Sequence, residues 1–186
     1  MATAYERLGD FASALPQWRS VHAVDPSNTN VALGVARCCV ELAQYREALD
    51  VLGRMQAASR PGAPTEHGSE PYWLEARAHL GVKDPAAAAR VAMRGIPLAP
   101  TGEARLDFVA GEAFFELGQF DEANGYLEKA TRYSPEHLRA WLLLGHVNCA
   151  TYAIRHRTPS LRASNVACPE GSGRAPHASQ LRASPW

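Results

Sequence analysis

Apolar residues recur along most of this chain at the spacing of one face of an α-helix. Between residues 29 and 43 they stand three or four positions apart, at Val31, Val35, Cys38 or Cys39, and Leu42. A half-buried strand would instead alternate apolar and polar residues. Residues 104–137 contain two helix-length segments, a short turn between them and a closing proline. The pattern predicts an all-α protein built from helix pairs.

The helix pair repeats along the chain. The corner Leu8-Gly9 returns 34 residues later as Leu42-Ala43, and Phe11, Ala14 and Trp18 return on the same spacing as Tyr45, Ala48 and Leu52. Later corners are predicted at Leu80-Gly81 and Leu117-Gly118. A single helix pair cannot bury its apolar face, so repeats of this kind stack on their neighbours. We therefore expect an α-solenoid of antiparallel helix pairs.

The repeat domain is predicted to span residues 1–150. Its units are about 1–28, 29–62, 72–100 and 104–137, followed by a partial unit at 138–150. Residues 60–71 contain three prolines and two glycines and are predicted to form a loop. Residues 151–186 form a basic tail rich in Arg, Ala, Ser, Pro and Gly, with no hydrophobic period. Such a tail cannot bury enough apolar surface to fold, so one expectation is a disordered tail. The other is a shifted reading frame or unspliced sequence, because the tail interrupts a repeat in mid-unit.

The unit at 104–137 has small, aromatic and proline residues at fixed positions: Gly111, Phe114, Gly118, Phe120, Ala123, Leu127, Ala130 and Pro135. In these residues and in its length of 34 it resembles a tetratricopeptide repeat. The resemblance covers about residues 1–150 and is weakest in the third unit, where a charged residue near Arg77 is expected at the usual aromatic position.

The resemblance implies both an architecture and a role. Stacked pairs of this family form a right-handed superhelix, and the first helix of each pair lines a concave groove that holds a peptide or a partner helix. Some members grip a carboxylate with Lys, Asn and Arg. The matching positions here are Leu33, Gly34 and Arg37 in one unit and Phe108, Val109 and Glu112 in another, so that clamp is not expected.

Charge is unevenly distributed. Residues 1–150 carry 14 Arg and Lys against 18 Asp and Glu, a net of −4, and residues 151–186 carry a net of +4. A mildly acidic repeat domain argues against a nucleic-acid partner. The chain has no long apolar run and no apolar leader at its start, so neither a membrane partner nor a secretory signal is expected. Cys38 and Cys39, adjacent on one predicted helix, suit neither one disulfide nor one metal and are expected to be small buried residues of a cytoplasmic protein.

No motif for catalysis occurs in the sequence. It contains no GxxxxGK[ST] phosphate loop, no HExxH pair and no GxSxG elbow. Glu75 and His79 are one helical turn apart and fit a solvated surface pair better than a proton-transfer pair. We therefore expect no enzyme activity, no cofactor, no metal and no small-molecule substrate.

One stripe of residues is a candidate binding surface. Phe108, Glu112 and Phe115 share a face of one first helix, and Leu142, His146 and Cys149 hold the matching positions of the next first helix. One interpretation is packing between neighbouring repeats or against the tail. The other is a mostly apolar groove for an amphipathic partner segment, with Phe108, Glu112, Phe115, Leu142 and His146 as contacts.

Two classes of function fit these features. The first is a non-catalytic protein-interaction scaffold. The second is the repeat arm of a larger enzyme, for example a glycosyltransferase, whose catalytic region is missing from this sequence because the reading frame is shifted. Translating the other two frames of the coding DNA beyond Ala150 would distinguish them, because further repeats favour the scaffold and a catalytic domain favours the enzyme. RNA binding by a related helical repeat of 35 residues is disfavoured by the acidity of residues 1–150.

Overall fold

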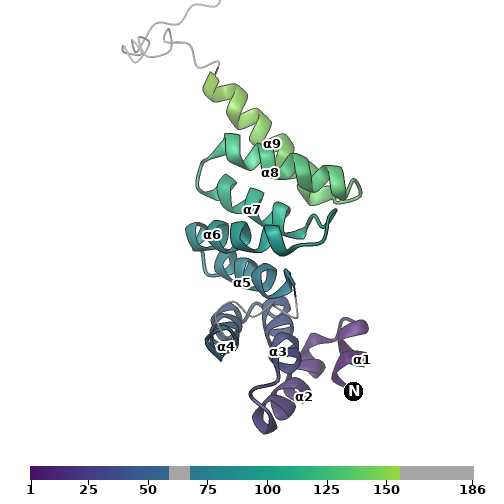
Figure 1. The fold of residues 1–186 in the computed structure, drawn as a ribbon. Coiled ribbons are helices and arrows are strands. Elements are labelled where there is room, and N and C mark those ends of the chain that lie inside the picture. Colours follow the sequence, from purple (N-terminus) through teal and green to yellow (C-terminus); the bar gives the residue numbers. More distant parts are fainter. Residues whose placement is uncertain (59–67, 156–186) are drawn as a thin grey trace, which may run out of the picture.

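The computed structural model describes residues 1–58 and 68–155, and over these ranges the chain forms α-helices and no strand. Figure 1 shows the helices stacked in chain order, from α1 at one end of an elongated molecule to α9 at the other. The helices are α1 Ala2–Arg7, α2 Phe11–Val24, α3 Thr29–Glu41, α4 Tyr45–Ala58, α5 Glu70–Gly81, α6 Pro85–Gly95, the short 3-10 helix η1 Ile96–Leu98, α7 Arg105–Glu116, α8 Phe120–Tyr133 and α9 Leu138–Arg155. The predicted α-solenoid is confirmed.

Short polar side chains begin several of these helices. The Asp10 carboxylate accepts a hydrogen bond from the Ser13 amide at 3.0 Å, and Asp84 accepts one from the Ala87 amide at 3.0 Å. Each bond satisfies an N–H group that has no partner within its helix. Pro85 follows Asp84 at the first helical position, where a missing N–H costs nothing. Local sequence thus determines where α2 and α6 begin.

The turns inside the four helix pairs share one backbone geometry. The residue after each C-cap has a positive φ, at Gly9 (74°), Ala43 (58°), Lys83 (65°) and Gly118 (73°). The next amide closes each turn, as where the Asp84 N–H donates to the His79 carbonyl at 2.9 Å. The third corner is therefore Val82-Lys83, and the predicted corner at Leu80-Gly81 is wrong by two residues.

Gly81 has a different task from the glycines at the corners. Glycine is the usual residue at a positive φ, and the sequence therefore predicts the corner at Gly81. In the structure, a Cβ atom at Gly81 would lie 2.4 Å from the Tyr45 ring, so glycine is needed there for close packing. Counted from the true corner, His79 rather than Arg77 stands at the position of Phe114, and the expectation of a charge at that position is wrong.

The apolar core is a row of clusters along the solenoid. One cluster joins α2, α3, α4 and α5, and the next joins α5, α6 and α7. Glycines allow second helices to approach closely. A Cβ atom at Gly111 would lie 2.6 Å from Leu127 on α8, and one at Gly34 would lie 2.6 Å from Trp18 on α2. Contacts within each helix pair and between neighbouring pairs therefore stabilise each unit, as expected for a stack of repeats.

Two predicted boundaries differ from the observed helices. Helix α5 begins at Glu70, two residues before the predicted start of the third unit, with Pro71 in its first turn. Helix α9 continues to Arg155, five residues beyond the predicted end of the repeat domain. Most of the predicted loop, residues 60–67, and the predicted tail from residue 156 onward lie outside the described residues. No helix in the described part of the chain combines the length and the apolar character that a membrane crossing requires.

Candidate functional site

The first helices of the successive units lie side by side. Helix α3 contacts α5, α5 contacts α7, and α7 contacts α9, whereas the second helices α4, α6 and α8 separate them along the chain (Figure 1). We call their common surface the A-helix face. It is formed by Arg37, Trp73, Arg77, Arg105, Phe108, Glu112, Phe115, Leu142 and His146.

Ion pairs link the first helices at the N-terminal end of the A-helix face. The guanidinium of Arg37 on α3 lies 3.0 Å from Glu6 on α1 and 2.6 Å from Glu70 on α5. Glu6 also accepts a hydrogen bond of 3.0 Å from the indole N–H of Trp18 on α2. Helix α1 has no buried residue. Glu6 links it to the rest of the stack through the hydrogen bond to Trp18 and the ion pair with Arg37.

Trp73 lies at the centre of the A-helix face with two arginines over its ring. The Cζ atom of Arg77 is 5.0 Å from the ring centroid, and that of Arg105, on the next first helix, is 4.8 Å away. Each cation has its own carboxylate, since Arg77 pairs with Glu41 at 2.7 Å and Arg105 pairs with Glu103. Cation–π attraction and these carboxylates together offset the repulsion between the two guanidinium groups.

The three predicted site residues on α7 lie at contacts between helices. Phe108 is half-buried, and its ring centroid is 4.5 Å from that of His137. Phe115 is also half-buried and meets Phe120 edge-on, with ring centroids 5.8 Å apart. Glu112 lies 3.3 Å from the guanidinium of Arg139 on α9, and burial raises the pKa of its carboxyl while Arg139 opposes that shift.

The two predicted site residues on α9 face solvent. Leu142 is 65% exposed, and His146 is exposed one turn further along the helix. Arg139 connects the two halves of the predicted stripe, because it pairs with Glu112 and its Cζ atom lies 5.6 Å from the centre of the Phe108 ring. The structure therefore brings Phe108 and Glu112 together beneath Arg139 and leaves Leu142 and His146 uncovered.

Models of one repeat family match the chain in two places, residues 7–63 and residues 108–148, and both are described as tetratricopeptide repeat. The chain is a tetratricopeptide repeat protein. The two matches contain the whole of the second unit and most of α7, α8 and α9, which carry the corner geometry described above. The resemblance inferred from residues 104–137 is thus confirmed.

Solved structures with this fold include MamA, YrrB and TTC0263. MamA is 20% identical, with a TM-score of 0.67 over 87% of this chain and 93% of its own. YrrB, described as a TPR protein with an unusual peptide-binding site, is 18% identical, with a TM-score of 0.63 over 87% of this chain and 78% of its own. TTC0263, a protein of Thermus thermophilus, is 16% identical, with a TM-score of 0.61 over 80% of this chain and 78% of its own. No curated protein matches this sequence significantly.

Sequence reasoning missed the cluster around Trp73. The misplaced corner put Trp73 and Arg77 out of register with Phe108 and Glu112, which stand nine and five residues before the next corner. The signal that could have found them is Asp84, the N-cap of α6, because counting back from this cap gives the correct register. Capping residues therefore define the tetratricopeptide register of this unit better than its glycine does.

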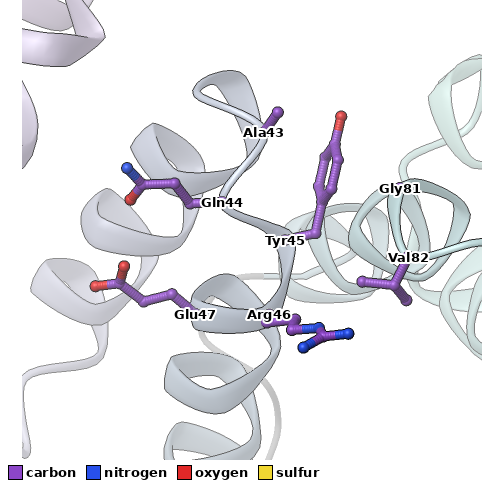
Figure 2. Close-up of a pocket in the computed structure, with 7 residues that line it drawn as sticks. All are labelled: Ala43, Gln44, Tyr45, Arg46, Glu47, Gly81 and Val82. Atoms are coloured by element: carbon purple, nitrogen blue, oxygen red, sulfur yellow. The ribbon is translucent and has the colours of Figure 1, made fainter.

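A hollow of about 510 Å³ lies where the turn between α3 and α4 meets the turn between α5 and α6. Its lining residues are Ala43, Gln44, Tyr45, Arg46, Glu47, Gly81 and Val82. Figure 2 shows Gln44 and Glu47 on the side away from Val82, and both are hydrogen-bonded to Arg19, at 3.1 Å and 2.6 Å. Two of the polar side chains that line the hollow are therefore already paired with a side chain of the protein.

The two adjacent cysteines are structural. Cys38 and Cys39 are buried in α3, as predicted. Burial raises the pKa of the Cys38 thiol to about 12 and that of Cys39 to about 11, so both stay protonated and unreactive near neutral pH. Within residues 1–58 and 68–155, no group of three or more His, Cys, Asp or Glu side chains is arranged to hold a metal ion.

Proposed function

We propose that this tetratricopeptide repeat protein is a non-catalytic scaffold that holds a peptide or partner helix along its A-helix face. The observation that carries the proposal is the cluster of Trp73, Arg77 and Arg105, in which an aromatic ring and two cations come from consecutive first helices. Tryptophan and arginine are the residues most often found at the energetic centres of protein interfaces. The fold shared with YrrB is compatible with a peptide ligand.

The chemistry of the A-helix face favours a partner that carries both carboxylates and apolar side chains. Arg77 and Arg105 each pair with a glutamate of this chain, and a carboxylate of the partner could replace either one. Beyond Trp73, we propose that Phe108, Glu112, Phe115, Leu142 and His146 continue the contact surface toward α9. Leu142 offers the largest apolar exposure among these five residues, and Arg139 offers a further cation beside it.

A peptide selection tests the proposal. A displayed library of random peptides is selected against the full chain, and the bound peptides are then measured against Arg105→Gln. Arg105 is half exposed, so this change should leave the fold intact and weaken the selected acidic peptides at least about fivefold. Arg90→Gln is the matched control, because Arg90 is an exposed arginine on the second helix α6. Peptides that bind both variants as tightly as the unmodified protein would contradict the proposed surface.

A further inference from the structure

Several positions that are covered on α7 have uncovered counterparts one repeat later on α9. Gly111 on α7 receives Leu127 of α8, and a Cβ atom at Gly111 would lie 2.6 Å from that side chain. Gly145 stands 34 residues later at the matching position of α9, and no described atom outside the local backbone of α9 lies within 4 Å of the place its Cβ would take. We call the space beside each of these two glycines the socket. Leu127 fills the socket at Gly111, and no described side chain fills the socket at Gly145.

Two further positions show the same difference. Asp107 on α7 is 5% exposed, whereas Trp141, its counterpart on α9, is 50% exposed. Ala104, just before α7, is buried, whereas its counterpart Leu138 is 75% exposed. The indole N–H of Trp141 already donates to the Pro135 carbonyl at 2.8 Å. Covering this ring would therefore leave no donor unsatisfied. We call Leu138, Trp141 and Gly145 the end face.

The structure contains a template for what fits the end face. On α7 the equivalent surface is covered by α8, which places Leu127 between Ala123 four residues earlier and Ala130 three residues later. The two small residues allow the helix axes to approach, and the large one enters the glycine socket. A complementary helix thus has a large apolar residue between small residues at the same two offsets.

Neither the second helices of a folded second copy nor residues 156–186 supply such a helix. In the second helices, the residues at the repeat positions of Ala123 and Leu127 are fully buried within their own units. They are Ala14, Ala48, Leu52, Ala88 and Leu127 itself. In residues 156–186 the large aliphatic residues are Leu161, Val166 and Leu181, and the residues four positions before them are Arg157, Arg162 and His177. None of the three therefore has the small residue that the template requires.

We propose that the end face binds an amphipathic α-helix of a partner protein, which completes the fifth unit in the place of a second helix. This surface adjoins the A-helix face. Trp141 and Gly145 lie on a different side of α9 from Leu142 and His146, whereas Leu138 stands one turn before Leu142. It continues the established contact between α7 and α8 by one repeat.

The chain's own α8 is the probe for this site. A labelled peptide of residues 119–134 is titrated against the full chain and its fluorescence anisotropy is followed. We expect saturable binding, and we expect the same peptide with Leu127→Ala to bind at least about tenfold more weakly, because it cannot fill the socket. No saturable binding, or equal binding of the two peptides, would overturn the proposal.

Blocking the socket gives the second test. Gly145→Leu should weaken the peptide at least about tenfold without lowering the thermal midpoint, because Gly145 lies in open space and leucine favours a helix more than glycine does. Gly125→Leu is the matched control, at an exposed glycine of α8 that also has nothing near it. Full binding by Gly145→Leu would overturn the proposal.

Two further results would each identify a different occupant of the end face and would also overturn the proposal. A dimer of the unmodified protein in sedimentation that Gly145→Leu converts to a monomer would identify a second copy as the occupant. Peptide binding that appears only after residues 156–186 are removed would identify the chain's own C-terminal segment.

Discussion

Lys83 and Gly81 stand two residues apart and meet opposite steric demands. Lys83 holds a φ of 65°, a backbone conformation that disfavours side chains with a Cβ atom. Gly81 needs no special φ, but the Tyr45 ring leaves no room for a Cβ atom. The residue types are therefore the reverse of what the backbone alone would select, because the packing of α5 against Tyr45 takes precedence.

Substitutions at these two positions should change stability in opposite directions. Lys83→Gly should raise the free energy of unfolding by up to roughly 1 kcal/mol, since it relieves the left-handed strain at the cost of only a weak exposed pair with Glu116. Gly81→Ala should lower it by roughly 1–3 kcal/mol, because the added methyl group meets the Tyr45 ring. Urea denaturation of both variants measures this. A stable Gly81→Ala protein would show that the ring can move aside.

Asp107 is a buried acidic residue of α7, and its counterpart one repeat later, on α9, is the exposed Trp141. The Oδ1 atom of Asp107 has no hydrogen-bond partner among the described residues. Burial raises the pKa of Asp107, and Lys129 only partly offsets this. Folding therefore favours the protonated form of Asp107. The contribution of this preference to the free energy of unfolding is present at low pH and is lost as the pH rises through the pKa of the folded state.

Asp107→Asn should consequently stabilise the protein at neutral pH. The amide is neutral at every pH, so the thermal midpoint of the variant should exceed that of the unmodified protein at pH 7, and the difference should shrink toward pH 3, where both side chains are neutral. Melting curves across this range measure the effect. A difference that grows as the pH falls would mean that Asp107 is stabilised in its charged form.

At the scale of elements, α7 has aromatic residues on two of its faces. Phe114 stacks on Tyr126 of α8, with ring centroids 5.4 Å apart and planes 8° apart. Phe108 lies on the A-helix face but also meets His137 and packs against Ala104, Ala130 and Ala140. Helix α9 repeats the second of these faces with Leu142, which has no comparable cover. The same stripe is therefore largely packing on α7 and surface on α9.

Alanine substitutions along the stripe should follow this difference. Phe108→Ala and Phe114→Ala should each lower the free energy of unfolding by about 3 kcal/mol, since each removes a ring held by several helices. Leu142→Ala should change it by less than about 0.5 kcal/mol, because the side chain is exposed. Thermal melts of the three variants compare them. If Phe108→Ala melts with the unmodified protein, the Phe108 ring is a free anchor for a partner.

At the scale of the whole molecule, each helix depends on the helices next to it. No described cluster of the core joins both ends of the solenoid, so the stability of each unit comes from its own pair and its immediate neighbours. Helix α1 contributes no buried residue, and the last turn of α9 exposes Tyr152 and Ile154. The two ends are therefore held by fewer contacts than the middle.

Amide hydrogen exchange should show this gradient. Protection should be greatest in α3, α5 and α7, which pack against neighbouring first helices as well as second helices, and should fall toward α1 and toward the last turns of α9. A partner helix bound at the end face would raise protection in α9 and leave α1 unchanged. Uniform protection along the chain would contradict neighbour-dependent stability and would indicate one cooperative unit.

The sequence by itself determined the class of fold and the family. Helical spacing and the corners 34 residues apart are local features, and stacking follows from them because an isolated pair cannot bury its apolar face. The predicted stripe on α7 and α9 was visible because helical periodicity alone places its members on one face.

Only the tertiary structure decided the packing role of Gly81, the cluster around Trp73 and the open end of the stack. Gly81 is glycine because the Tyr45 ring, from another unit, leaves no room for a Cβ atom, and the corner itself lies at Lys83. Trp73 acquired its two cations from α5 and α7, which lie together only when the units stack. Gly111 and Gly145 are the same residue type at the same repeat position, and whether each is covered depends on whether a second helix follows in space.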